Sequence, residues 1–249
     1  DDKQAVKWYR KAADQGDASA QYNLGSMYAN GRGVLKDDKQ AVKWYRKAAD
    51  QGDALAQYNL GFMYENGRGV LKDDKQAVKW YRKAADQGDA LAQFSLGLRY
   101  ANGTGVLKDD KQAVKWYRKA ADQGNALAQF SLGLRYANGE GVPKDAKQAV
   151  KWYQKAADQG DVDAQYFLGF MYDNGEGVLK DYKQAVKWYQ KAADQGAANA
   201  QFNLATMYGK GDGVLQDDKE AVRWYRKAAE QGDAEAQFMM GNLYNSGDA

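Results

Sequence analysis

The chain has 249 residues, of which 44% are hydrophobic, 28% charged and 13% aromatic, and its formal net charge is +3 at pH 7. This balance is typical of a globular protein, and the charge is too small to indicate a polyanionic partner by itself. No run of residues approaches the roughly 18 apolar residues of a membrane span. Histidine and cysteine are absent, which removes the commonest general base, thiol nucleophiles and nearly every structural zinc site. We therefore expect no catalytic residue, no cofactor and no metal.

The chain repeats one unit of sequence. Tryptophan recurs every 36 residues, at positions 8, 44, 80, 116, 152, 188 and 224, within nearly identical text. A fixed period of this length is typical of stacked repeat architectures. We expect a single repeat domain over residues 1–249, with units 1–36, 37–72, 73–108, 109–144, 145–180, 181–216 and 217–249.

The first part of each unit is predicted to be a helix. In the second copy, Asp37 and Asp38 are good N-cap residues whose carboxylates suit the positive end of a helix. Gly52 should end the helix, because glycine adopts the left-handed conformation without a Cβ penalty. Residues at three- and four-residue spacing form the expected buried side: Ala41, Trp44, Tyr45, Ala48 and Ala49.

A second helix should begin near Asp53 and end at Asn66-Gly67, with Ala56, Leu60 and Tyr64 on one face. Gly61 costs a helix about 1 kcal/mol relative to alanine, so we expect it to face the partner helix and allow a close approach. The connector after the helix should bury Val70. Helical hairpins cannot bury their apolar faces alone. The sequence therefore predicts an all-α, right-handed α/α superhelical solenoid of fourteen helices.

The second helix of the third copy, within "AQFSLGLRYANG" (Ala92–Gly103), has two apolar sides. Leu96 and Tyr100 lie on one side, and Leu91, Phe94 and Leu98 lie nearly opposite. Copies differ mostly on the second side, for example at Ser19, Leu55, Leu91, Leu127, Asp163, Asn199 and Glu235. We interpret the first side as core and the second as a separate stripe.

The segment "AVKWYRKAADQGDALAQYNLGFMYENGRGV" resembles the Sel-one-like (Sel1-like) repeat family, SLR, a relative of tetratricopeptide repeats. The resemblance covers essentially the whole chain and departs from the pattern at Ala205, Lys210 and Met240. It implies a non-enzymatic adaptor that binds other proteins. Bacterial members are invasion or signalling factors, or immunity proteins of toxic effectors. The resemblance favours a bacterial periplasmic or secreted protein, but the sequence leaves the compartment open.

The tetratricopeptide resemblance places the second stripe on a concave wall. We therefore expect a groove that binds a protein or peptide, with the chain acting as a monomer. Extended apolar surface usually marks an interaction site, although these side chains could also pack as core against the next repeat. Arg99 and Arg135 could neutralise a partner's carboxylate or form local ion pairs. The candidate groove residues are Leu55, Asn59, Phe62, Leu91, Phe94, Leu98, Arg99, Leu127, Phe130, Leu134, Arg135, Phe167 and Phe170.

A basic stripe on the first helix offers an alternative function, nucleic-acid binding, which a steep fall of affinity with salt would reveal. In the second copy it comprises Lys39, Lys43, Arg46 and Lys47. Acidic residues interleave with it, and Trp44 and Tyr45 are assigned to the core side, so we interpret it as a solvated face and expect no nucleic acid. "NGRGV" lacks the features of a phosphate loop and is predicted to be a turn.

Overall fold

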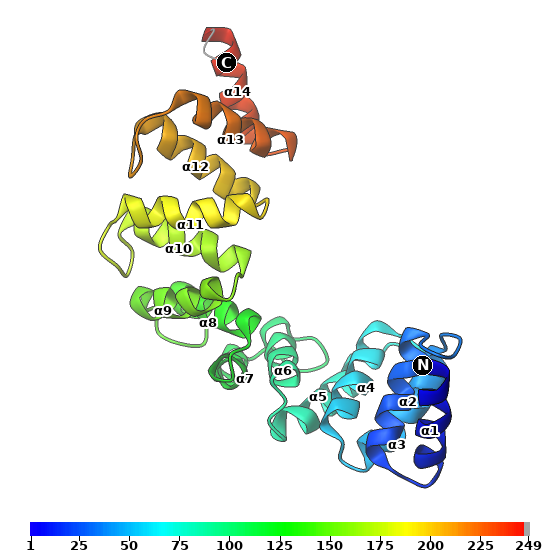
Figure 1. The fold of residues 1–249 in the computed structure, drawn as a ribbon. Coiled ribbons are helices and arrows are strands. Elements are labelled where there is room, and N and C mark those ends of the chain that lie inside the picture. The colour runs from blue at the N-terminus through cyan, green and yellow to red at the C-terminus, as the bar shows by residue number, and fades with distance from the viewer. Residues whose placement is uncertain (247–249) are drawn as a thin grey trace. The chain divides into compact units, whose positions relative to one another are not determined.

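A computed structural model describes residues 1–246, which form fourteen α-helices and no β-strand (Figure 1). The helices are α1 (Asp2–Asp14), α2 (Ala18–Asn30), α3 (Asp38–Asp50), α4 (Ala54–Asn66), α5 (Asp74–Asp86), α6 (Ala90–Asn102), α7 (Asp110–Asp122), α8 (Ala126–Asn138), α9 (Ala146–Asp158), α10 (Val162–Asn174), α11 (Tyr182–Asp194), α12 (Ala198–Lys210), α13 (Asp218–Glu230) and α14 (Ala234–Ser246). The predicted all-α solenoid of helical hairpins is confirmed.

Local capping sets the helix bounds. The Asp37 carboxylate accepts a hydrogen bond from the Gln40 N–H at 3.0 Å, and the Asp53 carboxylate accepts one from the Ala56 N–H at 2.7 Å. Gly67 ends α4 in the left-handed conformation, with φ at 65°. Each contact joins residues three or four positions apart or depends on one glycine, which is why the predicted ends are correct.

The predicted core residues of the hairpin are buried. Trp44 and Tyr45 on α3 are 6% and 3% exposed, and Ala56 and Leu60 on α4 are fully buried. Val70 was expected to be buried, but it is only half-buried. It lies in the connector after α4, beside Leu71, which is 91% exposed. Val70 packs against the core cluster of the second repeat but stays partly open to solvent.

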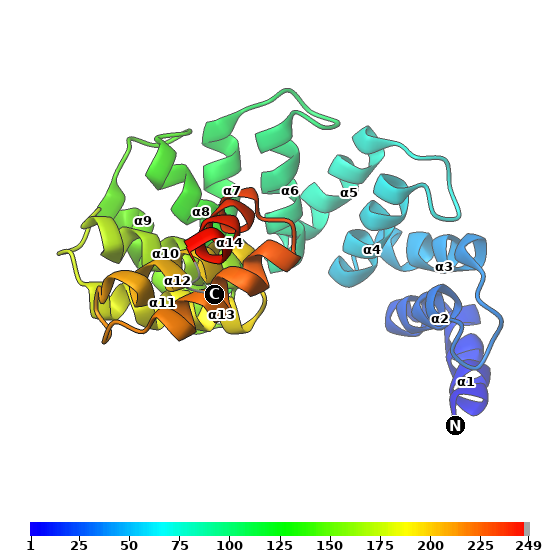
Figure 2. The same cartoon turned by 90° about the horizontal axis from the view of Figure 1, so that it is seen from above.

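The chain divides into two compact units, one from Asp1 to Asn125 with α1–α7 and one from Ala126 onward with α8–α14 (Figures 1 and 2). Within each unit, every helix packs against the next helix along the chain. A second helix, such as α4, contacts the first helix of the following repeat more extensively than it contacts its own hairpin partner. The junctions between repeats are therefore the main packing surfaces.

The helical glycine lies at this junction. A Cβ built on Gly61 would lie 2.8 Å from Cδ1 of Tyr81 on α5. The expected close approach is confirmed, but the neighbour was wrong: the glycine faces the next repeat and not α3 of its own hairpin. A tyrosine ring occupies the volume that a side chain at position 61 would need.

The repeated tryptophan also belongs to the junctions. Trp44 packs in a cluster with Val6, Leu24 and Met27 of the preceding repeat. Trp80 joins the cluster of the second repeat in the same way. Trp8, in the first repeat, is 62% exposed. Trp44 and Trp80 thus each stabilise the contact with the repeat before them.

Candidate protein-binding surface

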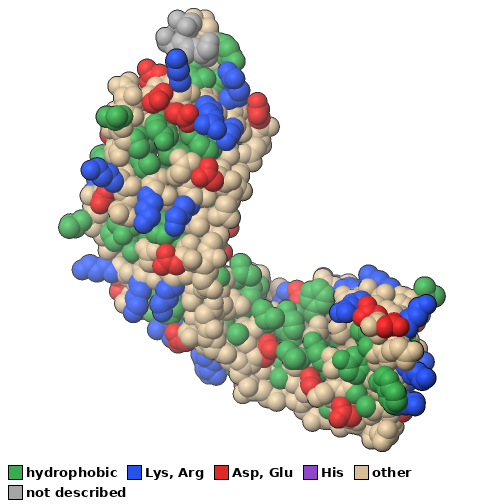
Figure 3. Space-filling model, viewed as in Figure 1, with side chains coloured by type: hydrophobic (Ala, Val, Ile, Leu, Met, Phe, Trp, Pro, Cys, Tyr) green, Lys and Arg blue, Asp and Glu red, His purple; other side chains and the backbone are tan. Residues whose placement is uncertain are grey.

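The first unit has an apolar stripe on α4 and α6, the first-unit stripe, which consists of Leu55, Phe62, Leu91, Phe94 and Leu98. Leu55 and Leu91 are 47% and 48% exposed, and Phe62 is 37% exposed. Hydrophobic side chains gather over α2 and α4 in the space-filling view (Figure 3). The two leucines, each at the start of its helix, are the most accessible members of the stripe.

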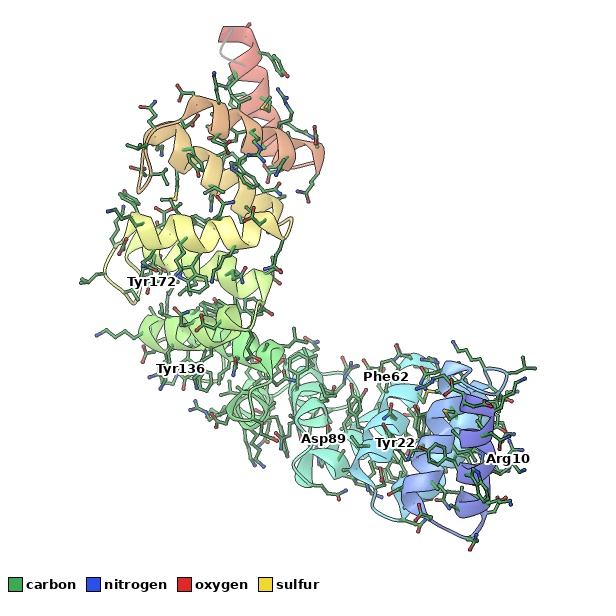
Figure 4. The ribbon with its side chains drawn as sticks, in the orientation of Figure 1. Arg10, Tyr22, Phe62, Asp89, Tyr136 and Tyr172 are labelled. Atoms are coloured by element: carbon green, nitrogen blue, oxygen red, sulfur yellow. The ribbon has the colours of Figure 1, made fainter. Side chains whose placement is uncertain are left out.

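Phe94 and Leu98 are half-buried. The Phe94 ring packs on the buried Tyr117 ring of α7, with centroids 5.8 Å apart. Tyr22, which is labelled in Figure 4, occupies the same place in its repeat, as does Tyr58. Their rings pack on the next repeat's tyrosine with centroids 6.0 and 5.7 Å apart. Phe94 therefore takes part in a junction as well as in the stripe.

Sequence reasoning did not single out Tyr22, Tyr58 and Tyr166 as members of this aromatic series. The signal was present, because every copy has tyrosine or phenylalanine at this position. A position that remains aromatic while its neighbours vary indicates packing shared by all repeats. The stripe is thus an exposed leucine edge beside a row of half-buried aromatic rings.

The polar candidate residues of the first unit, Asn59 and Arg99, form hydrogen bonds and ion pairs within the chain. The Asn59 side-chain amide donates to the Leu55 carbonyl at 2.8 Å. Arg99 forms an ion pair with Glu65, and its Nη1 lies 3.9 Å from the Asp74 carboxylate. The Arg99 side chain is only 15% exposed. The local ion pair, one of the two interpretations left open for Arg99, is what the structure shows.

Glu65 also links Arg99 to Tyr81, at the contact between the second and third repeats. The Tyr81 hydroxyl donates a hydrogen bond to the Glu65 carboxylate. Burial raises the pKa of Tyr81, and the hydrogen bond to Glu65 raises it further. At the equivalent position in the next copy, Ala101 is 6% exposed. This position, ten residues after Leu55 or Leu91, therefore turns away from the stripe and into the junction.

The second unit has a corresponding group on α8 and α10, the second-unit stripe, which consists of Leu127, Phe130, Leu134, Phe167 and Phe170. Leu127 is 54% and Phe170 37% exposed, and the other three are half-buried. The Phe130 ring lies 5.8 Å from those of Tyr153 and Phe167, between centroids. The aromatic contacts are more extensive here than at Phe94, because the Phe167 ring also packs on the Tyr153 and Tyr166 rings.

Polar groups border the second-unit stripe. Arg135 forms an ion pair with Glu140 in the following connector, so the local pair is present here as well. Asp163 is exposed at the start of α10. Burial raises the pKa of the neighbouring cap residue Asp161, while its hydrogen bond from the Ala164 N–H lowers it. The edge of this stripe therefore combines an apolar surface with carboxylates.

The basic stripe lies on the opposite side of the first helix from the core. Trp44 and Tyr45 are buried as predicted, and the Lys43 and Lys47 ammonium groups lie 5.6 and 4.5 Å from the centroid of the Trp44 ring. Arg46 donates a hydrogen bond to the Tyr64 hydroxyl. Part of the positive charge thus stabilises aromatic rings of its own repeat.

Among residues 1–246, no group of three or more acidic, histidine or cysteine side chains could hold a metal ion. In the same part of the chain, no helix has the length and apolar character needed to cross a membrane.

The packing defines a class of protein, the helical-hairpin repeat proteins, in which each repeat completes the core of its neighbour. The chain belongs to the Sel1 repeat family, whose pattern matches residues 1–17, 18–53, 54–89, 90–125, 126–161, 162–196, 198–233 and 234–249. Members of this family are generally non-catalytic scaffolds for protein interaction. Each full match joins a second helix to the first helix of the next repeat, the pair with the more extensive contact.

Solved structures show the same fold. The chain is 43% identical to c5321, a protective antigen of uropathogenic Escherichia coli strains with an SLR fold, at a TM-score of 0.94. That match covers 98% of this chain but 52% of the E. coli chain, so this chain spans about half the length of that structure. A Sel1 repeat protein from Oxalobacter formigenes is 38% identical, with 91% of each chain covered and a TM-score of 0.79. No curated protein matches the chain in sequence.

Proposed function

We propose that the chain is a protein-interaction scaffold that binds polypeptide segments on its first-unit and second-unit stripes, without catalysis and as a monomer. The observation that carries the proposal is the exposure of Leu55, Leu91 and Leu127, at 47–54%. Complete burial of a leucine side chain is worth about 1.5–3 kcal/mol, so covering the remaining half of each yields on the order of 1 kcal/mol. Within the first unit, Leu55 and Leu91 add these contributions along a bound segment.

The surroundings of each stripe support the same function. Half-buried rings such as Phe94 and Phe130 form a rigid base beside the leucines, and carboxylates and amides such as Asp163 and Asn59 border it. An apolar centre with a polar rim is the usual composition of an interface. Among the roles of bacterial relatives, host interaction is favoured, because c5321 is described as a protective antigen.

The experiment compares two double variants that carry the same chemical change. Leu55→Asp with Leu91→Asp alters the first-unit stripe, and Leu71→Asp with Leu107→Asp alters connector leucines that are 91% exposed. Both should keep wild-type helix content and melting temperature, because all four sites admit water. Peptides selected from a random display library against the wild-type chain are then measured against each variant by fluorescence anisotropy.

We expect the selected peptides to bind the connector variant as they bind the wild type. Their affinity for the stripe variant should fall about tenfold or more, because central anchors carry most of an interface's energy. Equal affinity for a folded stripe variant would refute the assignment. Lys43→Glu with Lys79→Glu, on the basic stripe, should leave peptide binding nearly unchanged, and salt-sensitive capture of nucleic acid lost in that variant would favour the alternative function.

A further inference from the structure

The second unit contains a cavity of ≈ 500 Å³ among α12, α13 and α14. These helices follow one another at the C-terminal end of the unit (Figure 1). The lining includes Thr206, Gly209, Lys210, Asp218, Tyr225 and Leu243. Apolar side chains form most of the walls, and the exposed side chains of Lys210 and Asp218 supply one ammonium group and one carboxylate.

In the first unit, four repeats earlier, side chains fill the space that corresponds to this cavity. Position by position, Gly209 corresponds to Glu65, Asp218 to Asp74, and Leu243 to Arg99. In the first unit, the Arg99 side chain reaches into this region, pairs with Glu65 and lies 3.9 Å from Asp74. In the second unit, glycine and leucine replace the glutamate and the arginine, and the carboxylate of the aspartate is kept.

In the second unit, a different hydrogen bond replaces the one that Glu65 accepts in the first unit. In the first unit, the Tyr81 hydroxyl depends on Glu65 for its hydrogen bond. In the second unit, the Tyr225 hydroxyl shares a hydrogen bond of 2.9 Å with the Thr206 hydroxyl. The junction therefore stays satisfied without the glutamate, since a buried hydroxyl without a partner would cost stability.

We infer that this cavity binds an arginine side chain of a polypeptide partner, with the guanidinium at Asp218 and the aliphatic part against the apolar walls. The inference rests on the proposed function, because it takes the partner to be a polypeptide. The partner's arginine would occupy the place in the second unit that corresponds to the place of Arg99 in the first unit. Asp218 is available for this contact, since the hydrogen bond that its carboxylate accepts from Gln216 is a long one of 3.3 Å.

The chemistry of the cavity favours arginine over other side chains. A guanidinium is planar and more weakly hydrated than an ammonium group, and it can donate two parallel hydrogen bonds to one carboxylate. Its three methylene groups suit walls formed by Val222, Met239 and Leu243. A purely apolar side chain would leave the Asp218 carboxylate unused. A carboxylate ligand could contact the exposed Lys210 ammonium group but would be repelled by Asp218.

The test uses small probes, so that it does not depend on knowing the partner. Two probes are titrated into the full chain, and binding is followed by NMR. One is N-acetyl-arginine N-methylamide, and the other is N-acetyl-citrulline N-methylamide, which has nearly the same shape but no charge. Two variants accompany the wild type. Leu243→Arg places the chain's own arginine in the cavity, and Leu215→Arg adds the same charge at a connector leucine that is 91% exposed.

We expect the arginine probe to bind the wild type and Leu215→Arg saturably, with shifts centred on residues 206–225. The citrulline probe and the Asp218→Asn variant should bind about tenfold or more weakly, a loss that corresponds to one charge-assisted hydrogen bond. Leu243→Arg should abolish binding while the chain stays folded. Absence of saturable binding to the wild type, or equal binding of the citrulline probe, would overturn the inference.

The two proposals fail separately. If the probe does not bind while the library peptides still require Leu55 and Leu91, only the arginine site is wrong. If the probe binds and the peptides ignore the first-unit stripe, the cavity remains a site and the proposed function of the stripe is refuted.

Discussion

Replacing Gly61 by alanine should destabilise the chain, although alanine is the better helix former. The substitution gains about 1 kcal/mol of helix propensity. Against this, the new Cβ would lie 2.8 and 2.9 Å from two carbons of the Tyr81 ring, closer than van der Waals contact permits. Forcing a methyl group into a packed core typically costs about 1–3 kcal/mol. The net effect is a loss of about 1 kcal/mol.

The cost depends on whether the Tyr81 ring can move. Tyr81 is fully buried, packs on Tyr58 and is held through its hydroxyl by Glu65. The sixth repeat shows an alternative, because Ala205 stands in the place of the glycine. There the rings of Phe202 and Tyr225 meet at 60°, whereas Tyr58 and Tyr81 meet at 37°. An alanine at position 61 requires a comparable rotation, which would break the hydrogen bond to Glu65.

Gly241 provides the matched control, since a Cβ at this helical glycine would meet no other atom within 4 Å. Gly241→Ala should therefore show only the gain in propensity, up to about 1 kcal/mol of added stability. Urea unfolding followed by far-UV circular dichroism measures both variants. If Gly61→Ala stabilises the chain as much as Gly241→Ala does, the contact with Tyr81 does not oppose a side chain at position 61.

Trp80→Ala should cost about 3–5 kcal/mol, because Trp80 is 6% exposed in a junction cluster, whereas Trp8→Ala should change stability little, because Trp8 is 62% exposed. Thermal unfolding of the two variants checks this difference, and equal losses would contradict the role assigned to the junctions. The hydrogen bond from Arg68 lowers the pKa of Asp38 below its usual value of 3.8. The Asp38–Arg68 pair therefore stabilises the fold fully above pH 3.8, and this stabilisation disappears as the pH falls through the lowered pKa of Asp38. Asp38→Asn should therefore unfold with a weaker dependence on acid pH than the wild type, as urea midpoints at a series of pH values would show; an unchanged dependence would assign the acid sensitivity to other groups.

The repeat period, the helices and their ends could all be predicted from the sequence, because each depends on interactions over a few residues. Asp53 caps α4 by binding the N–H of Ala56, three positions away. Gly67 ends the helix by its own backbone conformation. The buried side of α3 follows from the spacing of Trp44 and Tyr45, and copying one unit along the chain then indicates stacking.

Other features could not be predicted from the sequence, because they are contacts between repeats. Such contacts depend on how one helix is placed against another. Gly61 meets Tyr81 of the next repeat, and Arg99 pairs with Glu65 across 34 positions of the chain. Phe94 is half-buried because Tyr117 lies against it. The cavity beside Gly209 lies where glycine and threonine (Thr206) stand in the places that Glu65 and Phe62 occupy in the first unit. Spacing along a single helix fixes which side of that helix is apolar, but only the packing of neighbouring helices determines which of those side chains remain open to a partner.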